Sequence, residues 1–124
     1  MGFFSGLFGI ESETDVGKVQ EALAEILGDE ERVQLAYKLI RDLFVFTDKR
    51  FIIINKEGLT GKRTEYLSIP YRSISHFKVE SAGHFDIDSE LTIWISASSE
   101  PIVREFKSST NLIAVQKALA NFVL

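Results

Sequence analysis

The sequence predicts a mainly β domain with two helices. It is a seven-stranded antiparallel bent sheet or partly open barrel, with a capping C-terminal helix and an extra N-terminal helix. Short apolar or alternating runs recur between residues 33 and 106, each bounded by a turn signal. One amphipathic helical pattern precedes these runs and another follows them. The 124 residues, 45% of them hydrophobic, are enough to build one core.

The first helix is expected from about residue 15 to residue 27. Asp15 or Thr14 can cap its N-terminus, and Gly28-Asp29 ends it. Its apolar residues recur every three or four positions and predict one buried stripe, made of Val16, Val19, Leu23, Ile26 and Leu27.

The period changes to two at Val33, which predicts a half-buried strand up to Ile40. Val33, Leu35, Tyr37 and Leu39 should share one face and Gln34, Ala36, Lys38 and Ile40 the other.

The apolar runs 43–46 and 51–54 flank Thr47-Asp48-Lys49-Arg50, so they predict adjacent antiparallel strands joined by a tight turn. Gly58 and Gly61 predict the next hairpin. Four further strands are expected at residues 64–69, 73–80, 91–95 and 102–106, with Pro70 ending the first and residues 96–101 joining the last two.

The second helix is expected at the C-terminus, capped by Thr110 or Asn111. Its single apolar stripe must pack on the strands, and it consists of Leu112, Val115, Leu119, Phe122 and Val123.

Several of these segments together resemble the bacterial pleckstrin-homology domain family, over roughly residues 30 to 124. They are Thr47-Asp48-Lys49-Arg50, Gly58-Leu59-Thr60-Gly61-Lys62, Ile69-Pro70-Tyr71 with Ile74, Val79-Glu80-Ser81-Ala82-Gly83 and Asp88-Ser89-Glu90-Leu91. The resemblance implies a pleckstrin-homology-like barrel, no known catalytic activity and, in some members, cyclic homo-oligomers. Residues 1–29 are expected to form an aromatic segment and helix packed on the domain of residues 30–124.

Composition excludes some classes of function. A net charge of −4 argues against a general nucleic-acid binder. The absence of cysteine removes thiolate nucleophiles and thiolate zinc sites, and it fits a reducing compartment, so we expect a cytoplasmic protein. No apolar run is long enough to span a membrane.

Residues 49–63 hold five cations and one acid, whereas residues 11–31 hold eight acids and one lysine. This asymmetry can attract an anion such as a phospholipid head group, or it can pair with the acidic helix of a neighbouring subunit. The candidate anion-binding residues are Lys49, Arg50, Lys56, Lys62 and Arg63.

Phe3, Phe4, Leu7 and Phe8 form a second unusual feature, because such aromatic clusters rarely stay exposed in a soluble monomer. One interpretation is an interfacial membrane anchor, although the segment lacks the cations that would bind anionic lipid. The favoured interpretation is a patch buried against the barrel or another subunit, so these four residues are candidates for an oligomer interface.

The remaining patterns are weak. Asp86, Asp88 and Glu90 alternate but lack the spacing of a calcium loop, so no metal site is predicted. His76 and His84 have no partner at catalytic spacing, so no enzyme activity and no cofactor are expected. Trp94 is interpreted as a core or interface aromatic.

The sequence therefore predicts a non-catalytic binding and assembly module that forms a homo-oligomer, as a closed ring. The alternative is a peripheral module that binds anionic phospholipid head groups through residues 49–63.

Overall fold

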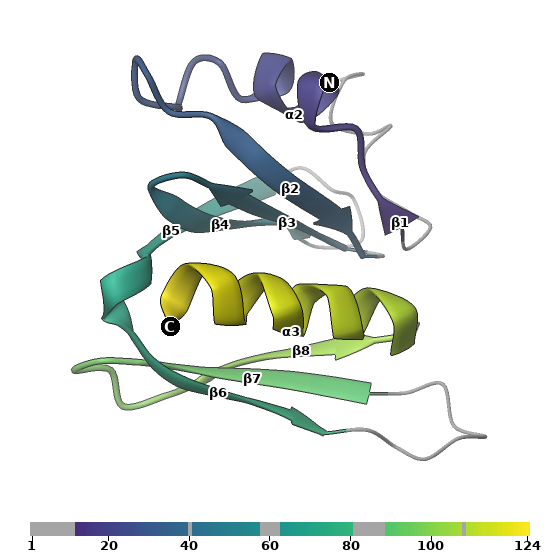
Figure 1. The fold of residues 1–124 in the computed structure, drawn as a ribbon, viewed down its shortest axis with the longest axis vertical. Helices are drawn as coiled ribbons and strands as arrows, with labels where there is room; N and C mark the ends of the chain where they lie inside the picture. The colour runs from purple at the N-terminus through teal and green to yellow at the C-terminus, as the bar shows by residue number, and fades with distance from the viewer. Residues whose placement is uncertain (1–11, 40, 58–62, 81–88, 108) are drawn as a thin grey trace. The chain divides into compact units, whose positions relative to one another are not determined.

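A computed structural model describes residues 12–39, 41–57, 63–80, 89–107 and 109–124. The chain divides into two compact units after Ile69. The strands β2 to β8 are antiparallel and form two sheets, accompanied by an N-terminal and a C-terminal helix (Figure 1). This confirms the predicted fold class. The division into residues 1–29 and 30–124 stays a prediction.

The first unit contains a five-stranded sheet in the order β1-β2-β3-β4-β5. The ladder between β3 and β4 pairs Asp42 with Asn55 and Phe46 with Phe51, so the predicted tight turn at Thr47-Asp48-Lys49-Arg50 is confirmed. The strands are β1 (Ser12–Glu13), β2 (Val33–Lys38), β3 (Asp42–Thr47), β4 (Arg50–Glu57) and β5 (Arg63–Pro70).

The strand β1 was not predicted. It pairs Ser12 with Lys38 and Glu13 with Tyr37 at the edge of the sheet. Two residues are too few to show any periodicity, so the sequence carried no signal for this strand.

The strand β3 is buried along its whole length, which explains its continuous apolar sequence. Leu43 and Val45 belong to the core cluster beneath α2. Phe51 stacks on Phe46 with ring centroids 4.5 Å apart and meets Phe44 edge to face at 5.3 Å.

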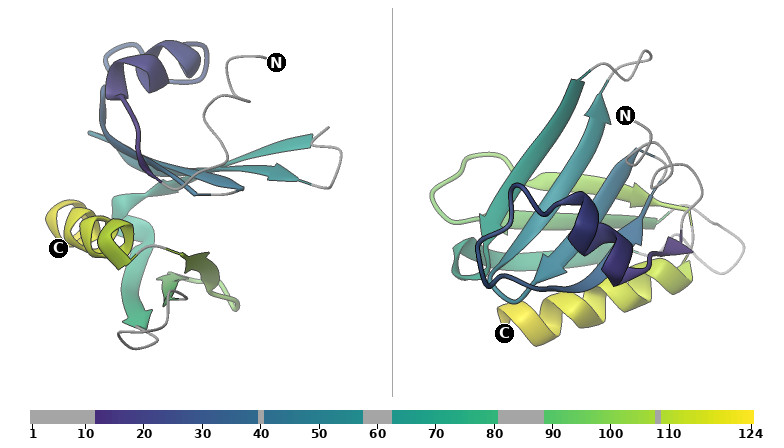
Figure 2. Two further views of the ribbon diagram at one scale, coloured as in Figure 1. Left: turned by 90° about the vertical axis from the view of Figure 1, so that its right-hand side faces the viewer. Right: turned by 90° about the horizontal axis from the view of Figure 1, so that it is seen from above.

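The helix α2 (Val16–Ala22) lies over one face of this sheet (Figure 2). Asp15 is its N-cap, as predicted, and accepts a hydrogen bond of 2.8 Å from the Gly17 backbone N–H. The alternative cap, Thr14, is wrong, because Asp15 accepts the N–H bonds of the first turn and the Thr14 hydroxyl has no hydrogen-bond partner in the described part of the chain. Val19 and Leu23 supply the buried contacts of this segment.

The predicted end of this helix at Gly28 is wrong. The segment that follows Ala22 is a turn in which the Ile26 carbonyl and the Gly28 N–H bond to the side chains of Arg50 and Glu31. These tertiary bonds replace helical ones. Val16 and Ile26 are exposed, so of the predicted apolar stripe only Val19, Leu23 and the partly buried Leu27 pack on the core.

The predicted alternation of β2 is also wrong in part. The register shifts between Val33 and Leu35, which indicates a β-bulge. Because one extra residue reverses the direction of the side chains that follow, Ala36 is fully buried and Leu35 only half-buried.

The second unit contains a three-stranded sheet in the order β6-β7-β8. Figure 1 shows α3 running across one face of this sheet, and the helix contacts all three strands. Tyr71 stacks on Phe122 at 5.2 Å. The elements are the short 3-10 helix η1 (Tyr71–Ser73), β6 (Ile74–Glu80), β7 (Ser89–Ile95), β8 (Ile102–Phe106) and α3 (Ser109–Val123).

The apolar stripe of α3 is largely as predicted, with Leu112, Val115 and Leu119 buried. The predicted caps Thr110 and Asn111 are wrong, because the helix begins at Ser109 and both residues lie in its first turn. An apolar stripe fixes the buried face of a helix but leaves its first residue uncertain by one or two positions. None of the described helices is both long and apolar enough to span a membrane.

Candidate functional site

The structure separates the candidate anion-binding residues. Lys49 is exposed in the β3–β4 turn and Arg50 begins β4. Lys56 lies near the end of β4 and Arg63 begins β5. Six residues of extended chain carry the backbone about 20 Å from Arg50 to Lys56. The cations therefore lie at opposite ends of the sheet; Lys62 lies outside the described residues.

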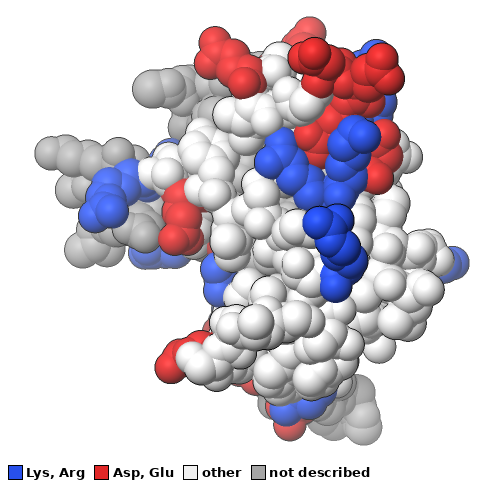
Figure 3. Space-filling view, turned by 90° about the vertical axis from the view of Figure 1, so that its left-hand side faces the viewer, with Lys and Arg blue, Asp and Glu red and all other residues white. Residues whose placement is uncertain are grey.

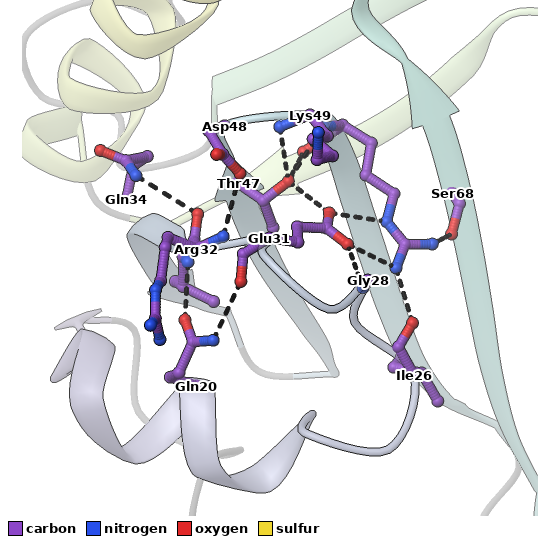
Figure 4. Close-up of polar contacts among 12 residues, drawn as sticks. Gln20, Ile26, Gly28, Glu31, Arg32, Gln34, Thr47, Asp48, Lys49 and Ser68 are labelled. Atoms are coloured by element: carbon purple, nitrogen blue, oxygen red, sulfur yellow. Dashed lines mark hydrogen bonds and ion pairs between the residues drawn. The ribbon is translucent and has the colours of Figure 1, made fainter.

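At one end, Arg50 is held by Glu31 (Figure 4). The Glu31 carboxylate is 3% exposed and accepts bonds of 2.9 Å from Nε and 3.0 Å from Nη2 of Arg50. The same guanidinium donates to Ser68 Oγ at 2.7 Å and to the Ile26 carbonyl at 2.8 Å. We name this group, Glu31, Thr47, Arg50 and Ser68, the Glu31 network.

Thr47 and Gly28 also bond to the Glu31 carboxylate. The fully buried Thr47 hydroxyl donates to Glu31 Oε2 at 2.6 Å and accepts from the backbone N–H groups of Lys49 and Arg50. The Gly28 N–H donates to Glu31 Oε1 at 2.8 Å. The ion pair of Glu31 and Arg50 thus joins the segment after α2, the β3–β4 turn and β5.

The environment of Glu31 determines its ionisation. Burial alone would raise its pKa, but hydrogen bonds from Arg50, Thr47 and Gly28, together with the charge of Arg50, lower the pKa to about 2. Glu31 is therefore ionised at neutral pH and neutralises Arg50.

The acidic and basic segments of the sequence thus meet within a single chain at this pair. Acidic and basic side chains lie beside one another in the upper part of the face shown in Figure 3. Asp29, Glu30, Arg32, Asp48 and Lys49 are all exposed. This end of the sheet offers a mixed surface rather than a cationic one.

The opposite end of the sheet gathers four cations, which we name the basic rim: Lys38, Arg41, Lys56 and Arg63. Lys38 ends β2 and pairs with Leu43 at the start of β3. The Arg41 carbonyl accepts a bond of 3.1 Å from the Lys56 backbone N–H. The strand β5, which begins at Arg63, is the neighbour of β4.

Two acids near the basic rim, Asp42 and Glu13, each interact with a neighbouring side chain. Asp42 is buried and accepts a bond of 2.8 Å from Asn55 Nδ2. Glu13 is exposed opposite Tyr37 in the β1–β2 pair. Burial, and then the charge of Glu13, raise the pKa of the Tyr37 hydroxyl. Glu57 ends β4 at the same side, and the exposed Glu65 lies two residues after Arg63 in β5.

The sequence analysis missed Lys38 and Arg41. Each stands alone in the chain, outside the run 49–63. The order of the predicted strands could have shown that these residues lie near Lys56, because in antiparallel strands the end of one lies beside the start of the next.

The second unit has a face that α3 leaves uncovered. Leu91, Ile93 and Phe106 are buried, and the alternate positions share the other side of the sheet by the two-residue period. We name this side the outer sheet face; it carries His76, Lys78, Glu80, Glu90, Thr92, Trp94, Val103 and Glu105.

His76 and Trp94 form the aromatic part of the outer sheet face. Their rings stack with centroids 4.4 Å apart and planes 10° from parallel. The Ser75 hydroxyl donates to the Trp94 carbonyl at 3.1 Å and lies 3.1 Å from His76 Nδ1. His76 is an exposed strand residue, and Trp94 is half-buried at the surface rather than in the core; His84 lies outside the described residues.

The acidic part of the outer sheet face is a row across the strands. Glu90 pairs with Glu80 on one side and with Glu105 on the other. Lys78 Nζ is 3.9 Å from Glu80 Oε1 and 6.0 Å from the centre of the Trp94 ring. Neither Glu90 nor Glu105 forms an ion pair with any residue that the structure describes.

The acidic row is not arranged to hold a metal ion. Over the described ranges, no group of three or more histidine or carboxylate side chains has the geometry to bind one. Asp86 and Asp88 lie outside these ranges, as do the candidate interface residues Phe3, Phe4, Leu7 and Phe8.

Comparison with known proteins is consistent with this fold. The family model described as "Bacterial PH domain" matches residues 2–123. The chain belongs to the bacterial pleckstrin-homology domain family. The predicted resemblance is therefore confirmed, and it extends to almost the whole chain.

Solved structures and a curated relative support the assignment. A pleckstrin-homology domain from Shewanella amazonensis is 54% identical, covers 99% of both chains and superposes with a TM-score of 0.84. A pleckstrin-homology domain protein from Shewanella loihica is 48% identical, with 94% of this chain and 99% of that chain covered and a TM-score of 0.81. The "uncharacterized protein YjqA" of Bacillus subtilis is 54% identical over 97% of both chains. These relatives establish the pleckstrin-homology fold.

Proposed function

We propose that this bacterial pleckstrin-homology domain is a non-catalytic module that self-associates into a closed homo-oligomeric ring. The observation that supports this is the outer sheet face. It combines the stacked rings of His76 and Trp94 with an exposed Val103, which is 42% accessible. Aromatic and aliphatic side chains grouped on one sheet face are typical of a protein interface.

The charge of the outer sheet face supports a ring. It carries three glutamates and one lysine. Two copies of this face would repel each other, so the face must meet a different surface of the next copy. Such head-to-tail contacts close into a ring when the rotation between copies allows it.

The test is the solution mass of the full chain at micromolar concentration, measured by light scattering. We expect a multiple of 14.0 kDa. Val103→Glu should reduce this mass, because it places a charge in the apolar part of the face. Ile113→Glu is the matched control, since Ile113 is an exposed aliphatic residue on α3. A wild-type mass of 14.0 kDa would refute the proposal.

The predicted N-terminal interface is tested in the same way. A chain that lacks residues 1–10 removes Phe3, Phe4, Leu7 and Phe8. Loss of assembly would place these residues in an interface, whereas an unchanged mass would favour a role for them at a membrane surface.

A second candidate function is binding of anionic phospholipid head groups. The basic rim favours it, because four cations gather at one end of the sheet. Arg50 contributes little to this candidate, since Glu31 neutralises it. Co-sedimentation with phosphatidylserine vesicles at low salt, lost as salt is raised, would support the candidate. No binding at low ionic strength would remove it.

A further inference from the structure

Residues 12–23, which we name the strap, consist of β1, the capping segment, α2 and Leu23. The strap crosses one face of the five-stranded sheet (Figure 2). Its apolar contacts are few, because Val19 is the one buried residue of α2 and Leu23 follows the helix. Seven residues are too few for a helix that is stable by itself, so α2 depends on these contacts. Beneath them lie buried apolar side chains of β2, β3 and β4: Val33, Ala36, Leu43, Val45, Ile52 and Ile54.

Gln20 fastens the strap to the edge of β2 (Figure 4). Its side-chain amide donates to the Glu31 carbonyl at 3.1 Å, and its oxygen accepts from the Val33 N–H at 2.8 Å. The Arg32 carbonyl, between these two residues, accepts a bond of 3.0 Å from the Asp48 N–H on the side of β3. Successive backbone groups of an extended strand point to opposite sides. The Gln20 amide therefore occupies edge groups that a neighbouring strand would otherwise satisfy.

The turn that follows the strap has bonds of its own. The Ile26 carbonyl accepts from Arg50, and the Gly28 N–H donates to Glu31. These bonds belong to the Glu31 network and involve no residue of the strap. The strap can therefore leave the sheet while residues 26–31 stay in place, so this turn can serve as a hinge.

The closed strap contains an unsatisfied polar group. The Thr14 hydroxyl is buried and has no hydrogen-bond partner among the described residues. A buried hydroxyl without a partner destabilises the state that buries it. Release of the strap hydrates this hydroxyl, which favours opening.

We propose that the strap is an autoinhibitory segment, which opens about the turn at residues 26–31 while the rest of the five-stranded sheet stays paired. Opening uncovers an apolar face and the edge groups of β2. The strap itself shows which partner fits this surface: an amphipathic helix with apolar residues at positions i and i+4, as Val19 and Leu23 are, and an amide at i+1, as Gln20 is. A helix of this kind from another protein competes with the strap for the same face.

Thiol labelling measures the opening, because the chain contains no cysteine. Ile52→Cys places a thiol on the face of β4 that the strap covers, and Ile53→Cys places one on the opposite face. Ile52 is 0% and Ile53 1% exposed, so neither thiol reacts in the closed state. With iodoacetamide in dilute urea, Ile52→Cys should react at least about tenfold faster than Ile53→Cys. Its rate should also depend less on urea, because opening exposes less surface than unfolding.

Gln20→Ala tests the attachment of the strap. It removes two hydrogen bonds to the edge of β2, so it should raise the labelling rate of Ile52→Cys about tenfold. Gln34→Ala is the matched control, since Gln34 is an exposed glutamine of β2 whose amide bonds only to the neighbouring Arg32 carbonyl at 3.3 Å. It should leave the rate unchanged. Far-ultraviolet circular dichroism of each variant establishes that it is folded.

A peptide of residues 12–28 is the probe for the uncovered face, because it carries Val19, Gln20 and Leu23. Fluorescence anisotropy of the labelled peptide should show that Gln20→Ala in the full chain tightens binding about tenfold. The change in affinity and the change in labelling rate should agree, since apparent affinity scales with the population of open chain. A peptide with Leu23→Asp should not bind.

Each part of the proposal has an outcome that overturns it. Equal labelling of Ile52→Cys and Ile53→Cys at every urea concentration would refute opening of the strap. Opening without binding of the peptide, or with an affinity that Gln20→Ala leaves unchanged, would refute the helix-binding face. The strap and the outer sheet face share no residue, so a monomeric wild type would refute self-association without bearing on the strap.

Hydrogen exchange of the unmodified chain keeps the test available if a cysteine variant does not fold. The Val33 N–H, which is bonded to Gln20, should exchange at least about tenfold faster than the amides of the β3–β4 ladder. Equal protection of these amides would show that the strap opens only when the whole sheet unfolds.

Discussion

The two ends of the five-stranded sheet carry similar cations in different surroundings. At one end, Arg50 is 24% exposed and donates bonds to Glu31, Ser68 and a backbone carbonyl. At the other end, the cations of the basic rim lie on separate strands, and the nearby Asp42 is bonded to Asn55. The first arrangement stabilises the fold, whereas the second places four cations near one another at one end of the sheet.

The difference shows that a run of positive charge in a sequence need not form one site. Extended chain carries Arg50 and Lys56 to opposite ends of a strand. A buried, paired charge contributes to the stability of the fold through geometry and hydrogen bonds, whereas an exposed charge acts on other molecules mainly through its electric field. Four measurements test this distinction.

The largest effect is expected from Glu31→Gln, which removes the charge from the centre of the Glu31 network. Arg50 would lose its ion partner while Thr47 and Gly28 would face a neutral amide. We expect a loss of about 3 kcal/mol in the free energy of unfolding, measured by urea denaturation. Glu30→Gln, at an exposed neighbour, should change it by less than about 0.5 kcal/mol. Equal effects of the two variants would contradict the assignment.

Lowering the pH should remove the contribution of ionised Glu31 to the free energy of unfolding without any mutation. The pKa of Glu31 is lowered from 4.5 to about 2 in the folded state. The unfolded chain therefore binds a proton more readily, so the contribution is complete above pH 4.5 and is lost as pH falls towards 2. It amounts to about 3 kcal/mol at most. Urea denaturation between pH 6 and pH 3 measures it, and Glu31→Gln should show a flatter pH dependence than the wild type.

A smaller effect is expected from Thr47→Val, which keeps the shape of the side chain but removes the hydroxyl. The backbone N–H groups of Lys49 and Arg50 lose their acceptor, and Glu31 loses a donor. The expected loss is about 1–3 kcal/mol in the free energy of unfolding. Thr64→Val, at an exposed position of β5, is the matched control and should be nearly neutral. An unchanged midpoint for Thr47→Val would show that the hydroxyl does not support the turn.

The smallest effect on stability is expected at the other end of the sheet. Lys56→Gln with Arg63→Gln should change the free energy of unfolding by less than about 0.5 kcal/mol, because Arg63 is exposed and Lys56 half-buried, and such surface charges contribute little to it. The variant should nevertheless reduce the salt dependence of self-association or of vesicle binding. A large loss of stability would show that the rim, like the Glu31 network, serves the fold.

The sequence predicted the fold well where periodicity and turn residues agree. The β3–β4 hairpin follows from two apolar runs around Thr47-Asp48-Lys49-Arg50, and the strand at Ile102–Phe106 has the bounds expected of it. Two of the errors share one cause. The end of α2 depends on the bonds that link Gly28 to Glu31 and Ile26 to Arg50, and the bulge in β2 accompanies the burial of Ala36; local sequence encodes neither.

The sites were less predictable than the fold. Arg50 was read with its neighbours as a binding cation because its partner Glu31 is 19 residues away in the sequence. Lys38 and Arg41 were missed for the converse reason, since only strand pairing brings them beside Lys56.

By itself, the sequence determined the class of fold, its order of elements and its family, because apolar periodicity and turn residues act over a few positions. It also determined how many charges of each sign the chain has. Only the tertiary structure decided which charges neutralise each other. Ion pairing depends on distances of a few ångströms between residues far apart in the chain, and the pairing of strands sets those distances.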